Sequence, residues 1–340
     1  MSEPGRTALI LGFPAEPACR VALGLASGNE MSVEVIVRPS DLPRARERIR
    51  RESAKIEIIE GDWNHIDFGL SGERFGRLSE QISSIYNLVP PCSYPDGDDL
   101  ESARTTGREV LELAAAAKNL RQVVVLSHLD VAGNHRGTFR EVDLVVGQRF
   151  DGGSAKMRLA AERVYRRHFG DVPITVIRSG WIVGDGENLC PLVHLCLAAG
   201  DSTPWEGNGQ LILTDLDYLV DVVAGLKDVD PDPGGRTLHL LSRFGGDTGK
   251  IVDGISVAAR EHVPSGFDLA AGARRALSRM DKTCRWSAGA FFKRRMSAAR
   301  FETTWTEEFL RSRRLPLPAQ EPSKLDRMVT IALEEIVGFR

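Results

Sequence analysis

The chain has 340 residues, of which 42% are hydrophobic and 27% are charged, and its formal net charge at pH 7 is −3. A chain of this length can bury a large core, as one α/β domain or as a domain with an appendage. The nearly balanced charge excludes a strongly basic surface over the whole chain, so we expect no nucleic acid as a partner. No stretch has the length and apolar character of a membrane span, and the first residues show no leader pattern. We therefore expect a cytoplasmic protein without membrane contact.

The cysteines give no sign of a disulfide framework or a metal site. There are five of them, an odd number without a Cys-x-x-Cys pair: Cys19, Cys92, Cys190, Cys196 and Cys284. This pattern is typical of buried thiols in a reducing compartment, and we expect no bound metal.

Strand-like and helix-like segments alternate through the first half of the chain. Short apolar runs predict strands at 7–11, 33–37, 56–59, 84–89, 123–126 and 174–177. Apolar residues at helical spacing predict helices at 19–26, 76–82, 101–117 and 157–167. Such an alternation favours a parallel sheet with helices on both faces. The fold class that we predict is α/β, with a doubly wound parallel sheet.

The alternation weakens beyond about residue 186. Helices are predicted at 189–199 and 215–226, strands at 211–213 and 238–241, and an arginine-rich helical region from 249 onward. We expect a sheet domain over 1–186 and a smaller substrate-binding lobe with a helical tail over 187–340, which returns strands to the sheet. The arginines of 293–314 alternate with Ala, Phe, Trp and Glu, which favours an amphipathic helix over a nucleic-acid-binding segment.

The turn after the first strand, at 12–18, is where the pyrophosphate of a dinucleotide would meet the amides at a helix N-terminus. Glycines are favoured in such a turn because a side chain holds the backbone away from the phosphates. Gly12 is present, and Ala15 and Ala18 stand at the next two small-residue positions. An alanine adds one methyl group, so the turn still admits a phosphate at a larger distance. A tight turn without a ligand is the alternative.

The ends of the second and third strands carry charges that indicate NADPH. Arg38 follows the second strand, where an acidic residue would bind a ribose 2′-hydroxyl and an arginine suits a 2′-phosphate. Arg44 and Arg46 add positive charge to the same region, and a solvated basic loop is the alternative. Asp62, at the end of the third strand, is placed to accept from the amino group of adenine, or else serves as a turn residue.

Polar residues also follow two strands near the middle of the chain. Ser127 and His128 come directly after the apolar run 123–126, and Ser93 follows the fourth strand. Because open α/β sheets bind ligands at the carboxyl ends of their strands, these residues are candidates for contact with a substrate. Ser127 can donate to a substrate or to a nicotinamide amide. Turn, capping and packing roles are the alternatives for all three.

Several short motifs occur in an order and spacing that resemble one family. They lie at 37–38, 61–62, 69–71, 110–114, 131–133, 141–144, 147–150, 161–162 and 177–185. Over about residues 7–245 the chain resembles an extended short-chain dehydrogenase/reductase, of the branch with thioester-reductase-like and epimerase-like proteins. The resemblance implies a Rossmann-type sheet, a bound NADPH and a small-molecule substrate, on a monomer or a homodimer.

The resemblance also implies the residues of both binding sites. Cofactor contacts fall on Gly12, Phe13, Pro14, Ala15, Arg38, Asp62, Trp63, Leu88, Val89, Pro90, Ser127, Arg158, Ser179, Gly180 and Trp181. The substrate pocket falls on Ser93, Tyr94, Trp181 and Trp205.

The catalytic residues depart from the family pattern. The family uses a serine or threonine, a tyrosine that protonates the substrate oxygen, and a lysine that binds the ribose and lowers the pKa of the tyrosine. In the family, the tyrosine and the lysine stand four residues apart on one helix. When the chain is aligned with the family at Ala161 and Glu162, the tyrosine position falls on Ser154, the lysine on Arg158 and the serine or threonine on His128. A register with Lys156 as the lysine places Gly152 at the tyrosine position, so neither register supplies a phenol.

These substitutions limit the chemistry of the site. A serine hydroxyl is a poor acid at neutral pH, so Ser154 does not replace a phenol. Arg158 stays protonated and can hold a ribose or a developing oxyanion, and His128 is the member of this set that titrates near pH 7.

The expected function follows from the resemblance and these limits. The resemblance extends to a tyrosine-free ketoreductase of this kind, and it implies an NADPH-dependent ketoreductase acting on an aromatic polyketide such as an angucyclinone, with the substrate assisting its own protonation. A catalytically inactive NADP(H)-binding regulator or scaffold, and a non-redox enzyme of the same fold, are the alternatives.

Overall fold

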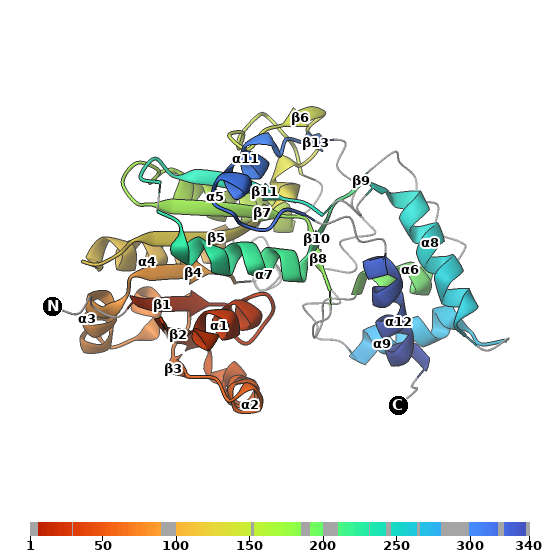
Figure 1. Cartoon of the computed structure of the whole chain (residues 1–340), viewed down its shortest axis with the longest axis horizontal. Helices are drawn as coiled ribbons and strands as arrows, with labels where there is room; N and C mark the ends of the chain where they lie inside the picture. The colour runs from red at the N-terminus through yellow and green to blue at the C-terminus, as the bar shows by residue number, and fades with distance from the viewer. Residues whose placement is uncertain are drawn as a thin grey trace.

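A computed structural model describes residues 6–28, 30–89, 100–150, 153–184, 191–199, 210–230, 232–242, 246–263, 266–279, 299–318 and 323–337. Within these residues, seven parallel strands form one sheet: β1 Arg6–Leu11, β2 Met31–Val37, β3 Ile56–Glu60, β4 Ser84–Asn87, β5 Gln122–His128, β7 Ile174–Ser179 and β11 Arg236–Leu240. The predicted α/β class and doubly wound parallel sheet are confirmed (Figure 1).

The order of the strands across the sheet is β11-β7-β5-β4-β1-β2-β3. This order reverses between β1 and β4, because β2 and β3 extend the sheet on one side of β1 and the later strands extend it on the other. Ligands of open parallel sheets bind outside the carboxyl ends of the strands at such a reversal. The ends of β1, β4 and β5 are therefore where a ligand is expected.

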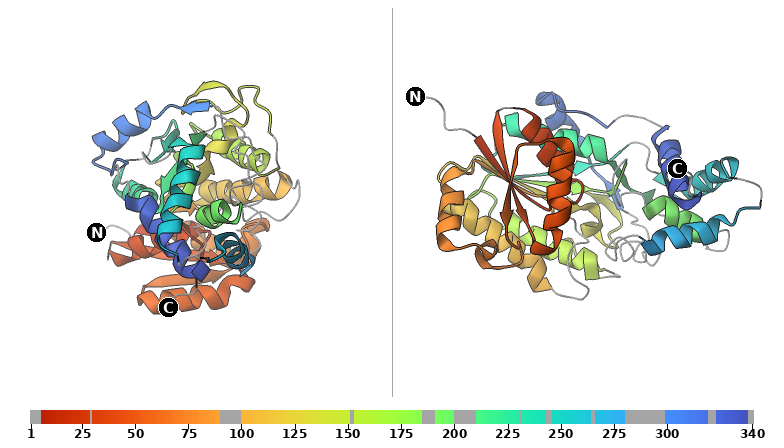
Figure 2. Two further views of the ribbon diagram at one scale, coloured as in Figure 1. Left: turned by 90° about the vertical axis from the view of Figure 1, so that its right-hand side faces the viewer. Right: turned by 90° about the horizontal axis from the view of Figure 1, so that it is seen from below.

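Helices cover both faces of the sheet because side chains of each strand alternate between them. On β1, Ala8 and Ile10 pack towards one face, and Leu9 and Leu11 pack towards the other, all fully buried. The first face carries α1 Ala18–Ser27, α2 Leu42–Glu52, α7 Leu216–Gly225 and α11 Thr304–Ser312. The second carries α3 Gly72–Gln81, α4 Leu100–Ala116 and α5 Gly153–Arg166 (Figure 2).

A separate helical lobe lies beyond the carboxyl ends of the strands, at the right of Figure 1. It contains α6 Pro191–Ala199, α8 Thr248–Glu261, α9 Leu269–Arg279 and α12 Ser323–Val337, which share one hydrophobic cluster. The pair β8 Trp181–Val183 and β10 Leu213–Asp215 connects this lobe to the sheet, and Val183 and Leu213 belong to the lobe's cluster. The chain then returns α7, β11 and α11 to the sheet.

Short elements complete the fold. Two further strand pairs are β6 Gly137–Phe139 with β13 Ala299–Phe301, and β9 Gln210–Leu211 with β12 Gly246–Asp247. Single 3-10 turns are η1 Pro39–Asp41, η2 Ile66–Gly69, η3 Leu129–Ala132 and η5 Leu226–Asp228.

The sequence left a solvated basic loop as the alternative for Arg44 and Arg46, and the structure places both arginines on a helix, α2. Both arginines are exposed on this helix, and only Ala45 of the helix is buried. Because the segment is mostly charged, its apolar spacing is too sparse to reveal a helix in the sequence. Among the described helices, none is long and apolar enough to cross a membrane.

Candidate functional site

The turn between β1 and α1 is tight because a neighbouring strand lies against it. Gly12 has a φ of +105°, and a Cβ there would lie 2.6 Å from the carbonyl oxygen of Leu88, just past β4. Only glycine accepts this conformation and this approach. The side chain of Phe13 is fully buried in the core below the turn. Gly12 and Phe13, both predicted cofactor contacts, therefore also serve the packing of β1.

The anion position at the start of α1 is taken by the chain's own carboxylate. Oε2 of Glu16 accepts the backbone N–H of Arg20 at 3.2 Å, and Oε1 accepts from a terminal nitrogen of Arg48 at 2.8 Å. The Glu16 side chain is 2% exposed. Burial raises the pKa of Glu16, against the opposing effects of the Arg20 amide and Arg48. Arg48 also donates from Nε to Sγ of Cys19 at 3.2 Å.

Other amides of this turn are also used within the chain. The N–H of Ala15 donates to the carbonyl of Gly12 at 3.0 Å, and that of Cys19 donates to Ala15 at 2.9 Å. Pro14 and Pro17 have no N–H to offer. Phosphate sites at helix N-termini depend on first-turn amides that have no other partner. The amides of Cys19 and Arg20 already donate within the chain, so this turn is a weaker candidate for a phosphate site.

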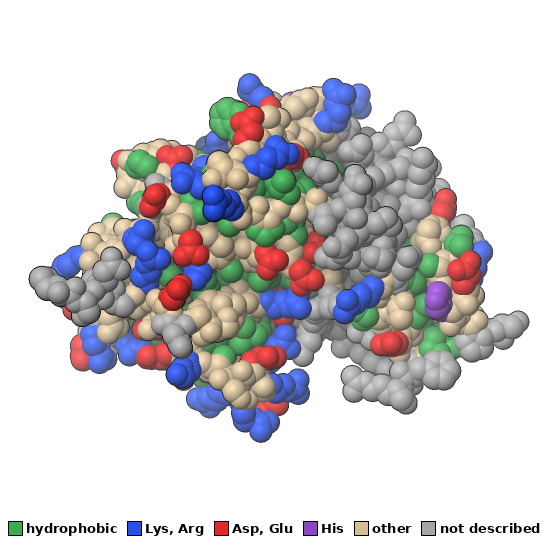
Figure 3. Space-filling view, viewed as in Figure 1, with side chains coloured by type: hydrophobic (Ala, Val, Ile, Leu, Met, Phe, Trp, Pro, Cys, Tyr) green, Lys and Arg blue, Asp and Glu red, His purple; other side chains and the backbone are tan. Residues whose placement is uncertain are grey.

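The end of β2 presents an arginine over an aromatic ring. The guanidinium carbon of Arg38 lies 4.7 Å from the ring centroid of Trp63, and Nε of Arg38 donates to Asp41 at 2.8 Å. Trp63 is almost fully buried, whereas 32% of the Arg38 side chain is exposed. Basic side chains gather over α2, the helix that follows Arg38 in the chain (Figure 3). A guanidinium on an aromatic plane can meet a phosphate with its open edge.

Asp62 is engaged by its own turn. Its Oδ1 accepts the N–H of Asn64 at 2.9 Å, and its Oδ2 lies 3.3 Å from Nδ1 of His65. These contacts stabilise the turn after β3. They favour the turn role for Asp62, which the sequence left open as the alternative to contact with adenine.

A histidine, an aspartate and an arginine meet at the carboxyl end of β5. Nδ1 of His128 accepts the N–H of Asp130 at 3.0 Å and lies 3.1 Å from Oδ1 of Asp130. The other carboxylate oxygen of Asp130 is bonded to Arg158 of α5. The ring of Trp181 stands edge-on to His128, with centroids 5.5 Å apart. The structure thus brings together three predicted site residues, His128, Arg158 and Trp181, and adds Asp130.

The position of Arg158 favours one of the two registers of α5. Arg158 is 7% exposed and faces Asp130 at the end of β5. Lys156 is exposed and lines a surface groove towards α4, together with Arg163 and Arg167. The geometry therefore supports the register with Arg158 at the lysine position and Ser154 at the tyrosine position. Ser154 belongs to the first turn of α5, and its side chain lies outside the described part of the chain.

A fully buried ion pair joins α5 to β7 beneath this edge. Arg178 and Glu162 have no exposed side-chain surface, and Arg178 donates to Oε1 of Glu162 from Nε at 3.1 Å and from Nη2 at 2.6 Å. The hydroxyl of Ser127 donates to Oε2 of Glu162 at 2.6 Å. Ser127 was a predicted donor to substrate or nicotinamide, and in this structure its only proton is directed to Glu162.

The network continues from Arg178 to β11. Nη1 of Arg178 lies 3.1 Å from Nε2 of His239, and Nδ1 of His239 lies 2.7 Å from the carbonyl oxygen of Glu302. A carbonyl oxygen only accepts, so Nδ1 carries the proton and Nε2 accepts from Arg178. Burial, reinforced by the charge of Arg178, lowers the pKa of His239 to about 3. The ring is therefore neutral at pH 7.

The tyrosines of the described residues are all core residues. Tyr86 and Tyr165 are fully buried, with hydrogen bonds to Gln122 and Asn87, and Tyr218 packs in the cluster under α7. Burial raises the pKa of Tyr86. Their positions favour structural roles.

Several predicted contacts serve the packing of the strand ends. Leu88 and Val89 are buried next to Gly12, and the hydroxyl of Ser179 donates to the carbonyl of Ser127 at 3.4 Å. The N–H of Gly180 donates to Oγ1 of Thr214 at 2.7 Å. Four predicted residues lie outside the described part of the chain: Pro90, Ser93, Tyr94 and Trp205.

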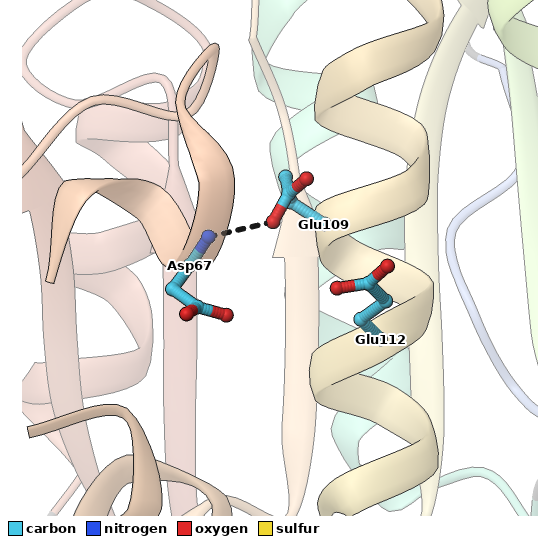
Figure 4. Close-up of side chains that lie close together, drawn as sticks. All are labelled: Asp67, Glu109 and Glu112. Carbon is cyan, nitrogen blue, oxygen red and sulfur yellow. Dashed lines mark hydrogen bonds between the residues drawn. The ribbon is translucent and has the colours of Figure 1, made fainter. Parts of the chain in front are cut away.

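One group of carboxylates has the spacing of metal ligands. Asp67, Glu109 and Glu112 each place an oxygen within 4.8 Å of the others. Figure 4 shows Glu109 of α4 accepting the backbone N–H of Asp67, at 2.7 Å. This bond anchors η2 to α4 and explains the approach of the carboxylates. The expected absence of a bound metal stays a prediction.

Two of the residues that sequence reasoning missed gave a signal that was available. Arg178 and His239 are polar residues inside apolar strands, and a buried charge requires a partner. Asp130 and Glu16 gave no comparable signal, because acidic residues are ordinary in turns.

A sheet of this order, with polar groups at the ends of β1, β2 and β5, is a Rossmann-type sheet. Together with the helical lobe beyond those ends, it gives the chain the fold expected from its resemblance to the extended short-chain dehydrogenases/reductases. Residues 25–190 match the model of an NAD-binding family described as male sterility protein. The matched segment begins after the turn that contains Glu16.

Solved structures show the same fold. The terminal R domain from the myxalamid PKS-NRPS biosynthetic pathway is 21% identical, with a TM-score of 0.74 over 100% of this chain and 93% of that one. The reductase domain of a nonribosomal peptide synthetase from Mycobacterium tuberculosis is 17% identical, with a TM-score of 0.71 over 98% and 92%. UDP-glucuronic acid 4-epimerase from Bacillus cereus, in complex with UDP-glucuronic acid and NAD, is 13% identical, with a TM-score of 0.66 over 98% and 100%. A search of curated proteins found no match.

The dinucleotide that the resemblance implies fits part of the described site. Arg38 on Trp63 offers a cation and an aromatic plane near the end of β2, and Arg158 offers a cation near the end of β5. The start of α1 does not fit a pyrophosphate as it stands, because Glu16 holds both the Arg20 amide and Arg48.

Proposed function

We propose that the protein is an NADPH-dependent reductase of a ketone in an aromatic polyketide, such as an angucyclinone, and that it works without a tyrosine acid. The observation that carries the proposal is the group formed by His128, Asp130 and Arg158 at the carboxyl end of β5. The resemblance described above assigns the catalytic residues of the family to this position.

Arg158 supplies a fixed positive charge. Its guanidinium is bonded to Asp130 and is 7% exposed, so its orientation is restricted by a buried partner. A guanidinium cannot transfer protons at neutral pH, but it can hold ribose hydroxyls or stabilise the negative charge that develops on a carbonyl oxygen. In this proposal Arg158 positions and stabilises, and it does not act as an acid.

The proton must come from another group. When bound, NADPH supplies the hydride that forms the new C–H bond of the alcohol. The oxygen of the former carbonyl then takes a proton from a phenol next to it on the substrate, and the phenolate regains its proton from water. His128 is the second candidate donor, since its neutral ring carries the proton on Nε2 when Nδ1 accepts from Asp130.

The comparisons support the class of substrate. Two of the structural neighbours are reductase domains of polyketide or peptide synthetase systems. This chain has the same fold as those domains, which supports a substrate whose carbonyl group is made by a synthetase of this kind. The fold by itself does not select the ketone.

A regulator that binds NADP(H) without turnover is the second candidate. The observation in its favour is the hydroxyl of Ser127, which donates to Glu162 and so does not point its proton at a substrate. Such a protein would need the nucleotide contacts at β2 and the ion pair at β5, and no proton donor.

Transfer of deuterium separates these functions. The protein is incubated with an angucyclinone ketone and NADPH deuterated at the transferred position, and the alcohol product is analysed by mass spectrometry. We expect one deuterium on the carbinol carbon. The matched substrate with a methylated neighbouring phenol should react at least tenfold more slowly, because a tenfold change corresponds to about 1.4 kcal/mol, within the contribution of one proton donor. NADPH binding without any transfer would contradict the reductase and favour the regulator, and absence of binding to both NADPH and NADH would exclude both functions.

A further inference from the structure

The start of α1 contains a complete carboxylate-binding site that is filled from within the chain. Glu16 immediately precedes Pro17 and reaches forward to the N–H of Arg20, the third residue of α1. A negative group at this end of a helix is stabilised by the unpaired amides and by the helix dipole. The carboxylate therefore occupies the kind of position in which this fold binds a phosphate.

The cation beside this carboxylate comes from another helix. Arg48 of α2 binds Oε1 of Glu16 at 2.8 Å, and its side chain is 22% exposed while that of Glu16 is 2% exposed. The side chain of Arg20 is directed elsewhere, to Asp217 of α7. Arg48 is thus the guanidinium that a second anion entering the turn would share with Glu16.

A carboxylate and a pyrophosphate cannot both use these two donors. The Arg20 amide has one hydrogen to donate, and two negative groups within a few ångströms repel each other strongly where water is scarce. We propose that Glu16 is a built-in competitor for the pyrophosphate of the cofactor, which must leave the Arg20 amide and Arg48 before the dinucleotide can bind tightly. This inference rests on the proposed NADPH-dependent function and concerns the regulation of the same site.

The exchange has a clear consequence for affinity. Because Glu16 must first separate from the Arg20 amide and from Arg48, the observed free energy of NADPH binding is smaller than that of a turn without this carboxylate. The variant Glu16→Gln keeps the size of the side chain and removes its charge, so its bonds to the amide and to Arg48 become neutral and weaker. We expect this variant to bind NADPH about tenfold more tightly, since neutral and charged hydrogen bonds differ by about that factor.

The test is a titration of the intact protein with NADPH, followed by tryptophan fluorescence and by calorimetry. Glu47→Gln is the matched control: it removes the same charge from α2, where Glu47 pairs with Arg50 and Arg51 at the surface. Adenosine 2′-monophosphate is the matched ligand, because it carries the phosphate expected at Arg38 and has no pyrophosphate. Thermal melting of each variant verifies that it is folded, and Glu16→Ala serves as a second variant without the carboxylate.

The expected result is a dissociation constant for NADPH that falls about tenfold in Glu16→Gln, is unchanged in Glu47→Gln, and is unchanged for adenosine 2′-monophosphate in every variant. Equal or weaker NADPH binding by both Glu16 variants would overturn the inference and leave the proposed function intact. An equal gain in affinity for adenosine 2′-monophosphate would also overturn it, because the effect would not then depend on pyrophosphate. Absence of NADPH binding in the wild type and in all variants would contradict the proposed function itself.

Discussion

Two glutamate–arginine pairs of this protein have the same chemistry and different roles. Glu162 and Arg178 are completely buried, and further bonds join them to Ser127, His239 and the carbonyl of Asp143. Glu16 and Arg48 lie at the start of α1, where Arg48 is partly exposed. The first pair has no access to a ligand, whereas the second holds donors that a ligand needs.

The two pairs differ in the exposure of the arginine, and this exposure decides which role each pair can take. Removing one member of a buried pair is strongly destabilising, because the remaining charge is not solvated by water. In a pair whose arginine is partly exposed, as Arg48 is, water can solvate the guanidinium while its carboxylate partner is exchanged for another anion. We therefore assign Glu162–Arg178 to the support of the β5 and β7 ends, and Glu16–Arg48 to the control of a binding site.

The largest expected effect comes from breaking the buried pair. Glu162→Gln leaves the guanidinium of Arg178 without a charge partner at a position with no exposed surface. We expect the free energy of unfolding, measured with urea, to fall by about 3 to 5 kcal/mol. Glu73→Gln, which removes a carboxylate from an exposed pair with Arg77, should change it by less than about 0.5 kcal/mol. Similar losses in both variants would show that the buried network has no special role.

The pH dependence of stability tests the same network through His239. Its pKa is lowered from 6.5 to about 3 in the folded chain. A lowered pKa means that the unfolded chain binds the proton more readily, so stability is complete above about pH 6.5 and is lost as the pH falls towards 3. We expect this residue to account for a loss of roughly 2 kcal/mol between pH 7 and pH 5.

The variant His239→Gln isolates this contribution, because glutamine does not titrate and can still accept from Arg178 through its amide oxygen. Unfolding curves of both proteins at pH 7 and pH 5 should show a shallower pH dependence for the variant. Parallel curves would mean that His239 is not the titrating group.

At the exposed end of the site, Arg38 tests the choice of cofactor. Arg38→Ala should weaken NADPH binding by about tenfold or more, through loss of a charged bond to the 2′-phosphate, and should change NADH binding less than twofold. The control is Arg50→Ala, which removes an exposed arginine of α2 that pairs with Glu47. Equal losses for NADPH and NADH would exclude a role of Arg38 in phosphate recognition.

The smallest effect is expected at Ser154. If the substrate provides the proton, Ser154→Ala should retain at least about half of the turnover, since a serine hydroxyl is a poor acid near neutral pH. Rates of NADPH oxidation with the ketone substrate measure this directly. A loss of two orders of magnitude would make Ser154 a participant in the reaction.

The sequence predicted the sheet because its strands are apolar runs with few interruptions, as in Val123, Val124, Val125 and Leu126 of β5. It could not predict which side chains pair beneath the site. Glu162 and Arg178 lie 16 residues apart on different elements, and Arg178 and His239 lie 61 apart. Such contacts depend on how strands are ordered in the sheet, which a run of residues does not reveal.

The turn at α1 illustrates a different limit. Its small-residue pattern, Gly12 followed by Ala15 and Ala18, predicted a turn that still admits a phosphate. The carboxylate of Glu16 looked ordinary in the sequence, since acidic residues are common in turns. Only the folded turn shows that it reaches the helix amide and Arg48.

A crystal structure of the protein with NADPH would show directly whether Glu16 yields its place to the cofactor. We predict the pyrophosphate against the amides of α1 and Arg48, with the Glu16 side chain turned away, the 2′-phosphate beside Arg38, and the nicotinamide near His128 and Arg158. A structure with Glu16 still on the Arg20 amide and side chains filling the place of the nicotinamide would contradict this prediction.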